Sequence, residues 1–372
     1  MNILVFFTYD VNLKVWIESG LLSREIEIYR RLHQRGHNIG FVTYGDESEF
    51  QLASNIDFSV QIFPLYLTRK KKKNKFLNSL STLLTVATLS KRKLRHFDVI
   101  KSNQLWGSWA ALLCAALTRR PFILRSGYEY NKFAAKSRSI PFRVLAGAIS
   151  FLLYHRADRL VFTTVEDALF VRDRFIIRDS KICIIPNLIC TDKFSYRERN
   201  YHGDVIMVSR LEPQKDLFLA IDVIRDLGLS LTIVGKGSLR NEIIRRARDL
   251  KGFSLIDRVD NDDLPELLSQ HKAYLSTSLY EGNPKSTLEA MAAQVVVIVR
   301  NSEGLSSIIH SGVNGYVFTS RHELKELLAR IVKLESSDTR VTACAREFVK
   351  STHGVDVILE KEEELYAKLV KH

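Results

Sequence analysis

Two glutamates, Glu281 and Glu289, stand eight positions apart around a short loop and the start of an expected helix. Gly282 and Pro284 tighten the loop, and the free backbone N–H groups of a helix opening at Lys285 would face it. A helix N-terminus binds phosphate, and a glutamate one turn inside it can accept hydrogen bonds from the vicinal hydroxyls of a ribose. The segment therefore predicts a nucleotide site. The alternative is a helix whose acidic residues merely complement its positive end.

A basic pair lies upstream of this segment. Arg210 and Lys215 are spaced by five on the turn between an expected strand and an expected helix. An arginine offers a planar fork and a lysine a point charge, so both could converge on a diphosphate. The alternative is a solvated loop. Between the two segments, Gly235 and Gly237 form a Gly-x-Gly turn after a strand, which alone is a weak nucleotide signal.

Together these motifs resemble the retaining glycosyltransferases of family four, which have the GT-B fold. The matching segments, in chain order, are Ile-Pro-Asn-Leu-Ile-Cys-Thr-Asp-Lys-Phe (185–194), Ser-Arg-Leu-Glu-Pro-Gln-Lys-Asp (209–216), Ile-Val-Gly-Lys-Gly (233–237), Glu-Gly-Asn-Pro-Lys-Ser-Thr-Leu-Glu-Ala-Met-Ala (281–292) and Ser-Gly-Val-Asn-Gly-Tyr (311–316). The resemblance covers residues 185–320, and its specificity comes from the order and spacing of the motifs.

The resemblance implies a role for each matching residue. Arg210 and Lys215 would hold the donor diphosphate as catalytic groups, with Glu281 beside the donor sugar and Glu289 on the ribose. The further donor contacts would be Gly282, Asn283, Pro284, Lys285, Ser286, Thr287 and Leu288 in the loop and helix start, and Gly235, Gly237, Arg258 and Val259 around the base. No metal or other cofactor is expected besides the nucleotide-sugar co-substrate, because two cations and helix N–H groups can stabilise the leaving group.

The first half of the chain departs from the family pattern at two places. Members usually carry a Gly-Gly pair that opens the first long helix, and Gly20 stands alone there. They often carry a histidine after a mid-domain strand, where Ser126 stands here. Gly20, Ser126 and Tyr128 are the candidate donor contacts of this half. Arg125, Tyr128 or Glu129 could replace the histidine, and simple loop packing is the alternative for Tyr128 and Glu129.

Short apolar runs alternate with helical patterns along the chain, which predicts right-handed βαβ units and parallel sheets. The fold class is therefore α/β, with two Rossmann-like domains facing across a cleft. Residues 1–190 would form an acceptor-binding domain, residues 191–350 a nucleotide-sugar-binding domain, and residues 351–372 a helix that packs back on the first. The expected strands are Ile3–Thr8, Asn38–Thr43, Phe58–Pro64, Phe97–Lys101, Pro121–Arg125, Arg159–Thr163, Ile182–Ile185, Gly203–Ser209, Ser230–Val234, Phe253–Ile256, Ala273–Ser276, Val295–Arg300 and Gly315–Phe318.

The charge of the chain is concentrated in its first half. Residues 1–195 carry 30 basic and 16 acidic side chains, whereas residues 196–372 carry 25 and 26. The basic segments Arg69–Lys75 and Lys91–Arg95 flank an apolar helical pattern, which favours peripheral docking on an anionic membrane. A solvated loop is the alternative. Nucleic acid is not expected, because the basic segments are not interleaved with stacking aromatic residues.

Several features of the sequence predict the cellular compartment of the protein. The four cysteines match no zinc pattern and are expected to be buried thiols of a cytosolic protein. The apolar N-terminus is expected to be a strand, not a signal peptide, and no run is long enough to span a membrane. The run Asp260–Asp263 is expected to cap a helix rather than bind metal. These features place the protein in the cytoplasm, on the inner face of the cytoplasmic membrane.

The expected activity is transfer of a hexose or N-acetylhexosamine, with retention, from a UDP- or GDP-sugar to an anionic lipid-linked or polysaccharide acceptor in bacterial surface glycan synthesis. Two alternatives stay open. One is a nucleotide-sugar epimerase of the same fold, which would need carboxylates and histidines facing the sugar. The other is a non-catalytic GT-B subunit that localises a partner enzyme, against which the presence of Arg210, Lys215, Glu281 and Glu289 argues.

Overall fold

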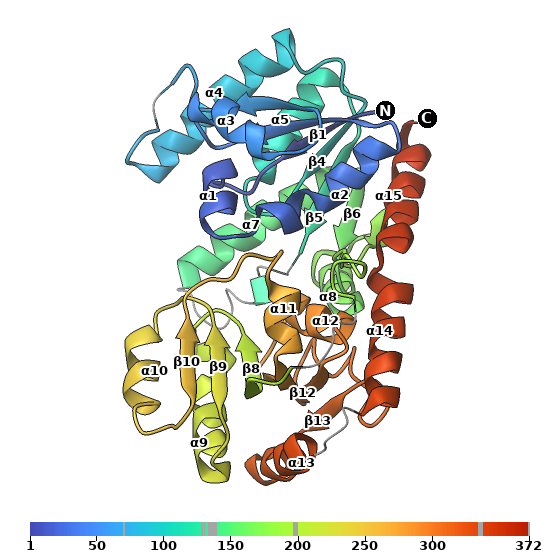
Figure 1. The fold of residues 1–372 in the computed structure, drawn as a ribbon. Coiled ribbons are helices and arrows are strands. Elements are labelled where there is room, and N and C mark those ends of the chain that lie inside the picture. Colours follow the sequence, from blue (N-terminus) through green and yellow to red (C-terminus); the bar gives the residue numbers. More distant parts are fainter. Residues whose placement is uncertain are drawn as a thin grey trace. The chain divides into compact units, whose positions relative to one another are not determined.

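The computed structural model describes residues 1–69, 71–127, 129, 131–132, 140–195, 200–333 and 338–370. The chain forms two compact units. The first comprises Met1–Pro186 together with Leu359–His372, and the second comprises Asn187–Ile358. Each unit is a parallel sheet with helices on both faces (Figure 1).

In the described part of the chain, the first unit holds a seven-stranded parallel sheet in the order β3-β2-β1-β4-β5-β6-β7. Its strands are β1 (Asn2–Phe6), β2 (Asn38–Thr43), β3 (Val60–Pro64), β4 (Val99–Ser102), β5 (Phe122–Ser126), β6 (Arg159–Phe162) and β7 (Ile182–Ile184). Its helices are α1 (Leu13–Glu18), α2 (Leu22–Gln34), α3 (Ser48–Leu52), η1 (Ala53–Asn55), α4 (Lys75–Arg92), α5 (Ser108–Thr118), α7 (Ile140–Arg156), α8 (Val165–Phe175), η2 (Asp179–Lys181) and most of α15 (Val355–Val370).

Alternate residues of these strands face opposite layers of helices, as the two-residue period of a strand requires. Leu4 and Phe6 belong to the core that also contains side chains of α4, α5, α7 and α8. On the other face, Phe7 stacks on Trp16 of α1 and Phe41 meets Tyr29 of α2. The sheet is therefore buried on both faces.

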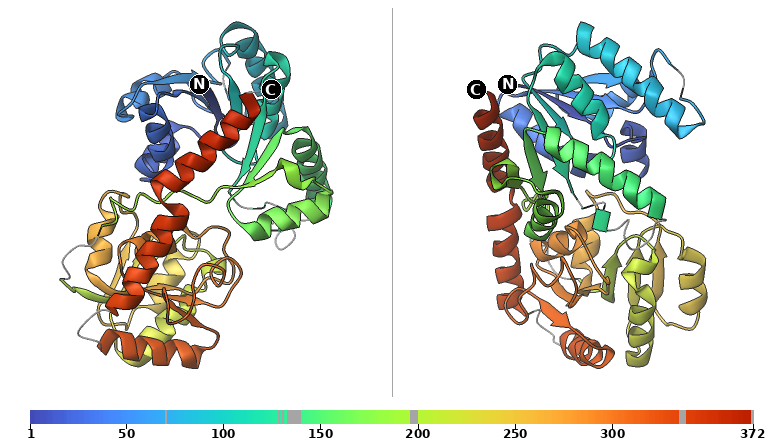
Figure 2. Two further views of the ribbon diagram at one scale, coloured as in Figure 1. Left: turned by 90° about the vertical axis from the view of Figure 1, so that its right-hand side faces the viewer. Right: turned by 180° about the vertical axis from the view of Figure 1, so that it is seen from behind.

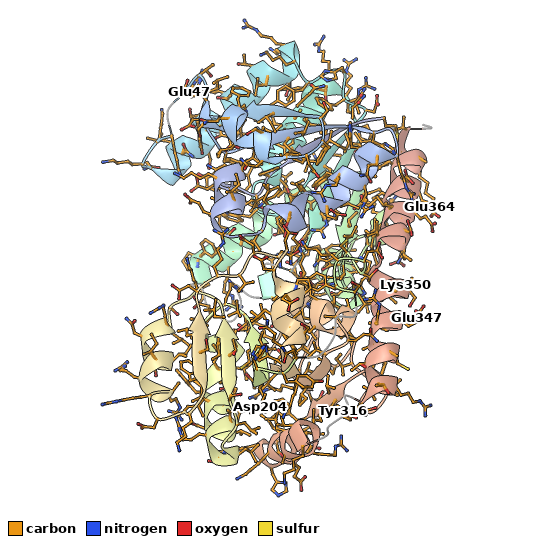
Figure 3. All side chains as sticks on the ribbon, viewed as in Figure 1. Glu47, Asp204, Tyr316, Glu347, Lys350 and Glu364 are labelled. Atoms are coloured by element: carbon orange, nitrogen blue, oxygen red, sulfur yellow. The ribbon has the colours of Figure 1, made fainter. Side chains whose placement is uncertain are left out.

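The C-terminal helix α15 joins this second face through a buried polar contact. The Lys101 ammonium of β4 binds both carboxylate oxygens of Glu362 at 2.6 Å and the Tyr366 hydroxyl at 3.2 Å. Lys101 and Glu362 are each almost fully buried. Burial lowers the pKa of Lys101. Burial also acts to raise the pKa of Glu362, but the charge and hydrogen bonds of Lys101 and Tyr366 outweigh it and hold that pKa below its usual value. Glu364, labelled in Figure 3, lies exposed on the same helix.

The second unit holds, within the described residues, a six-stranded parallel sheet in the order β10-β9-β8-β11-β12-β13. Its strands are β8 (Gly203–Val208), β9 (Leu231–Val234), β10 (Phe253–Ile256), β11 (His271–Ser276), β12 (Val296–Arg300) and β13 (Tyr316–Phe318). Its helices are η3 (Pro213–Lys215), α9 (Leu217–Leu227), α10 (Arg240–Arg246), α11 (Leu264–Ser269), α12 (Lys285–Ala292), α13 (Arg321–Lys333) and α14 (Thr339–His353).

Each strand expected from the sequence falls on an observed strand, and the expected parallel α/β architecture is confirmed. The expectation of buried thiols is wrong in part. Cys114 is buried, Cys183 and Cys190 are half-buried, and Cys344 is exposed because it lies on the outer side of α14. None of the helices in the described residues is long and apolar enough to cross a membrane.

Candidate functional site

The second sheet reverses its strand order between β8 and β11. The chain proceeds from β8 to β9 and β10 in one direction, and from β11 to β12 and β13 in the other. The loops that leave β8 and β11 therefore diverge, and ligands of such sheets bind at the carboxyl ends of the strands beside this switch point. Arg210 follows β8, Gly235 follows β9, Arg258 follows β10, and Glu281 follows β11. The sequence-predicted residues of the second half thus share one edge of one sheet.

An ion pair joins the two loops at the switch point. The ammonium group of Lys215, at the end of η3, pairs with the carboxylate of Glu281. Backbone contacts fix both partners, since Thr277 Oγ1 donates to the Lys215 carbonyl oxygen at 2.8 Å and Gln214 Nε2 donates to the Tyr280 carbonyl oxygen at 2.6 Å. Only 10% of the Lys215 side chain and 15% of the Glu281 side chain are exposed. The pair is thus preorganised and largely shielded from water.

Gly235 and Gly237 support the loop that carries Arg210. A Cβ atom on Gly235 would lie 1.9 Å from the Ser209 carbonyl oxygen, and one on Gly237 would lie 2.4 Å from the Leu211 carbonyl oxygen. The Leu211 N–H also donates to the Lys236 carbonyl oxygen at 2.9 Å. The Gly-x-Gly turn therefore lets the loop after β9 touch the backbone on both sides of Arg210, whose own side chain is exposed.

The N-terminus of α12 faces the same edge of the sheet. Its first turn contains no acidic residue, and no side chain hydrogen-bonds across its N-cap, Pro284. The Tyr274 hydroxyl of β11 lies 2.9 Å from Ser286 Oγ in this first turn. Burial raises the pKa of Tyr274 to about 12, so the phenol stays neutral at physiological pH. This helix start has the partial positive charge that favours an anion.

Glu289 lies one turn further along α12 and is only 2% exposed. Its Oε1 atom accepts a hydrogen bond from Asn261 Nδ2 at 3.0 Å, and Lys193 Nζ donates to Asn261 Oδ1 at 2.9 Å. Asn261 belongs to the acidic run that was expected to cap α11. Asp263 does occupy the N-cap position, but its side chain makes no capping hydrogen bond. The prediction that a side chain of this run caps α11 is therefore wrong. Asn261 of the same run instead orients Glu289.

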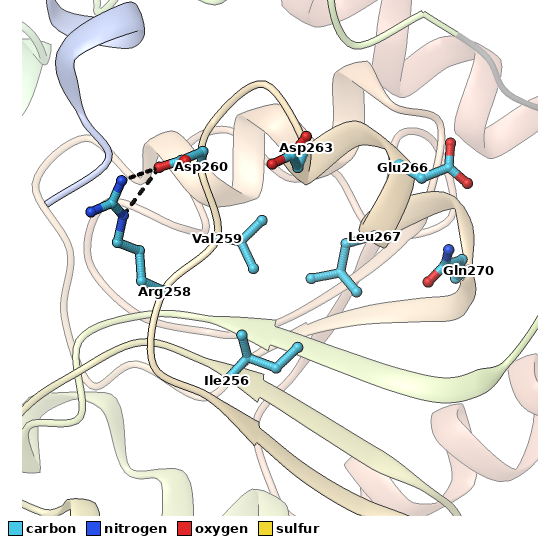
Figure 4. A pocket seen from close by; sticks show the side chains of 8 residues that line it. All are labelled: Ile256, Arg258, Val259, Asp260, Asp263, Glu266, Leu267 and Gln270. Atoms are coloured by element: carbon cyan, nitrogen blue, oxygen red, sulfur yellow. Dashed lines mark hydrogen bonds and ion pairs between the residues drawn. The ribbon is translucent and has the colours of Figure 1, made fainter. Parts of the chain in front are cut away.

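A pocket of about 480 Å³ lies between the turn after β10 and α11 (Figure 4). Ile256, Val259 and Leu267 give it an apolar lining, whereas Asp260, Asp263, Glu266 and Gln270 provide polar groups. Arg258 is held by Asp260, to which its Nε donates at 3.1 Å. The two residues predicted to border the base, Arg258 and Val259, therefore line a real pocket.

The residues predicted in the first half lie in the first unit. Gly20 has φ +69° and ends α1, with the Leu21 N–H donating to the Trp16 carbonyl oxygen at 2.8 Å. Ser126 is fully buried at the end of β5 and hydrogen-bonds Tyr154. Tyr128 lies outside the described residues. A contact of these residues with the donor stays a prediction.

Glu129, a proposed substitute for the histidine, is fully buried. It accepts hydrogen bonds from the Tyr154 hydroxyl at 2.5 Å and from Asn131 Nδ2 at 2.6 Å, and its own N–H donates to Asp167 Oδ2 at 3.1 Å. Burial raises the pKa of the Glu129 carboxyl, and its hydrogen bonds oppose that rise. These contacts favour loop packing, the alternative kept for Glu129, over direct contact with a sugar.

The described residues contain no group of three or more histidine, cysteine, aspartate or glutamate side chains placed to hold a metal ion. The expectation of a metal-free diphosphate site stays a prediction.

Two family models match adjacent parts of the chain. The model described as "Glycosyl transferases group 1" matches residues 191–348, and the model described as "Glycosyltransferase Family 4" matches residues 26–193. The boundary between the two models lies close to the start of the second structural unit at Asn187. Each half of the chain therefore matches a glycosyltransferase family model.

Curated relatives match at low identity. A "Glycosyltransferase 1 domain-containing protein 1" of Xenopus tropicalis is 28% identical over 129 residues, which is 35% of this chain and 36% of that protein. A poly(ribitol-phosphate) alpha-N-acetylglucosaminyltransferase of Staphylococcus aureus is 28% identical over 171 residues, 41% of this chain and 33% of that protein. The matches thus span about a third of these relatives. A UDP-Gal:alpha-D-GlcNAc-diphosphoundecaprenol alpha-1,3-galactosyltransferase of Escherichia coli is 19% identical, covering 86% of this chain and 87% of that protein.

Solved structures share the whole fold. A glycosyltransferase from Rickettsia africae has a TM-score of 0.77 at 16% identity and covers 100% of this chain and 99% of its own. The Anabaena protein HepE in complex with UDP also has a TM-score of 0.77 at 16% identity, covering 99% of this chain and 100% of its own. At such identity the likeness concerns the fold, and it confirms the expected GT-B class.

Proposed function

The chain belongs to the group 1 glycosyltransferases with the GT-B fold, and from this membership we propose that it transfers a sugar from a nucleotide diphosphate donor. The observation that carries the proposal is the Lys215–Glu281 ion pair at the switch point of the second sheet, with Arg210 on the neighbouring loop. The Anabaena neighbour is a complex with UDP, which supports a UDP-sugar donor, and a GDP-sugar is the second candidate.

The diphosphate would lie between Arg210, Lys215 and the start of α12. Lys215 enters the site as a fixed cation, and Arg210 can move to chelate phosphate oxygens because its side chain is exposed. The Lys285 N–H donates to the Asn283 carbonyl oxygen at 3.0 Å, so the backbone N–H of Ser286 in the first turn of α12 would provide the positive end of the helix. These groups neutralise the charge that develops on the leaving diphosphate without a metal ion.

The transfer would retain the anomeric configuration. The acceptor hydroxyl oxygen bonds to the anomeric carbon as the bond from that carbon to the diphosphate oxygen breaks. The bonding electron pair leaves with the diphosphate, which takes up the acceptor proton on the same face of the sugar. Glu281, which pairs with Lys215, would contact the donor sugar, Glu289 would bind the ribose, and the pocket at Arg258 and Val259 would receive the base.

The acceptor would be a lipid-linked or polymeric glycan of a bacterial surface. Two relatives support this class: one is named for poly(ribitol phosphate) and the other for a sugar diphosphoundecaprenol. Both acceptors carry phosphates, and the excess of basic side chains in residues 1–195 complements them. The segments Arg69–Lys75 and Lys91–Arg95 would hold the protein at an anionic cytoplasmic membrane surface.

The test is turnover of a panel of UDP- and GDP-sugars, with and without a lipid-diphosphate acceptor, with the product anomer assigned by NMR. The proposal expects an acceptor-dependent product with the anomeric configuration of the donor, formed equally well in the presence of EDTA. Free epimerised sugar without acceptor would indicate an epimerase. Absence of turnover by the isolated chain would indicate a non-catalytic subunit.

A further inference from the structure

Helix α7 exposes an unusual number of large apolar side chains. Ile140 is 73% exposed, Val144 67%, Leu145 57%, Phe151 53% and Leu152 50%. Their spacing places them on one side of the helix, opposite the buried Ala146, Leu153 and Tyr154. Surface helices of globular proteins carry charged and polar residues on this side, so α7 is apolar where a solvated helix would not be.

A second helix in the same layer shows the same property. Leu77, Leu80 and Leu84 are each about half exposed and follow one another at helical spacing along the outer side of α4. Helix α5 lies between the two, in contact with both, and all three cover the same face of the first sheet. Seen from behind in Figure 2 (right), α4, α5 and α7 lie beside one another. We call the exposed apolar residues of α4 and α7 the α4–α7 face.

The charge around this face is predominantly positive. Helices α4, α5 and α7 contain no aspartate or glutamate, and residues 58–157 hold 19 basic side chains against two acidic ones, Asp98 and Glu129. Glu129 is fully buried and so adds no charge to the surface. Exposed basic residues lie at the ends of the helices, namely Lys91 and Arg92 on α4 and Arg143 and Arg156 on α7. One carboxylate from outside this range reaches the basic segment before α4, where Asp10 pairs with Lys71. An apolar surface bordered mainly by positive charge matches the interface of an anionic bilayer.

We propose that the α4–α7 face inserts its apolar side chains among the headgroups of an anionic lipid bilayer, with α7 as the principal contact. The inference rests on the proposed lipid-linked acceptor and adds to it the part of the fold that enters the membrane surface. The basic segments at the two ends of α4 attract the surface at long range, while Val144, Phe151 and their neighbours provide the short-range apolar contact. This arrangement would bring the first unit to a membrane-held acceptor.

The test is co-sedimentation of the full chain with vesicles of phosphatidylcholine alone or mixed with phosphatidylglycerol. The wild type is expected to bind the mixed vesicles and to be released by high salt. The double variant Val144→Glu/Phe151→Glu should bind about tenfold or more weakly, because two carboxylates replace apolar contacts and repel the surface. The matched control is Ile244→Glu on α10 of the second unit, which is 41% exposed and should leave binding unchanged.

Three results would overturn the proposal. The wild type could fail to bind either vesicle, or the α7 double variant could bind as well as the wild type. The face could instead join two copies of the chain, in which case the wild type would elute as a dimer, the double variant as a monomer, and neither would bind vesicles. Nucleotide binding by the same proteins separates this inference from the proposed function, because a failure of lipid binding with intact UDP or GDP binding concerns the α4–α7 face alone.

Discussion

The ammonium group of Lys215, in the turn after β8, forms an ion pair with the carboxylate of Glu281, in the loop after β11. The two residues are 66 positions apart in the sequence, and they meet because β8 and β11 are neighbours in the sheet. Glu281 therefore neutralises a cation that is proposed to bind phosphate. This competition predicts different effects for the two partners.

Lys215→Gln should weaken nucleoside diphosphate binding by about 1.5–3 kcal/mol, since it removes a charge-assisted hydrogen bond. Glu281→Gln should keep or tighten that binding while lowering transfer, because it leaves the Lys215 charge unopposed but removes a group beside the donor sugar. Calorimetry with UDP and GDP measures the first effect, and product formation measures the second. Glu303→Gln, at an exposed site in the neighbouring loop, is the control. Equal losses of nucleotide affinity in both partner variants would contradict the assigned roles.

Gly237→Ala should weaken donor binding through the loop that carries Arg210. The added Cβ would lie 2.4 Å from the Leu211 carbonyl oxygen, so the loop must shift. We expect the affinity for a nucleoside diphosphate to fall more than the thermal stability does. Gly228→Ala is the matched control, because it strains a φ of +65° but meets no atom within 4 Å. A control variant that lost as much affinity would show that the effect is general destabilisation.

The effects of substitutions at Lys101 and Glu362 on the free energy of unfolding should be strongly non-additive. Lys101→Met or Glu362→Leu alone leaves one buried charge without its partner and should destabilise the first unit by about 3–5 kcal/mol. The double variant should be less destabilised than either single variant, because no unpaired charge remains. Urea unfolding of the wild type and the three variants, followed by the fluorescence of Trp16 and the other tryptophans, completes the double-mutant cycle. Additive losses would mean that the pair contributes little beyond packing.

Glu129 should make stability fall as the pH rises. Burial raises its pKa in the folded state above the value of about 4.3 that it has when unfolded. A raised carboxyl pKa contributes stability fully below the unfolded pKa and loses it as the pH climbs through the folded pKa. The wild type should therefore lose stability relative to Glu129→Gln between about pH 4 and the folded pKa. Urea unfolding of both proteins across this range measures the difference. A constant difference, or one of opposite slope, would rule out a buried carboxyl of raised pKa.

The sequence predicted the strands well because each is a short apolar run between turn residues, and in a parallel sheet such runs are buried on both faces. It also placed Arg210, Gly235 and Glu281 on one edge, since all three follow expected strands. The starts of two helices are also marked by residues that cap them. Thr164 Oγ1 accepts from the Asp167 N–H before α8, and Ser320 Oγ accepts from the Glu323 N–H at the start of α13.

Other features could not be read from spacing. Asn261 and Glu289 are 28 positions apart, and their hydrogen bond depends on how α11 packs beside α12. The burial of Glu129 depends on Tyr154 and Asp167, which come from two later helices. The outward-facing residues of α7 are as apolar as those of a core helix, so composition alone would place them inside. In each case the tertiary neighbours decide what the side chain does.

The proposed donor site is tested most directly by calorimetric titration of UDP and GDP into the wild type, Arg210→Ala and Arg245→Ala. Arg245 is an exposed arginine of α10 in the same unit and serves as the control. We predict that the wild type and Arg245→Ala bind one of the two nucleotides with similar affinity, while Arg210→Ala binds it about tenfold or more weakly. No binding of either nucleotide, or equal binding by all three proteins, would contradict a diphosphate site at the switch point of the second sheet.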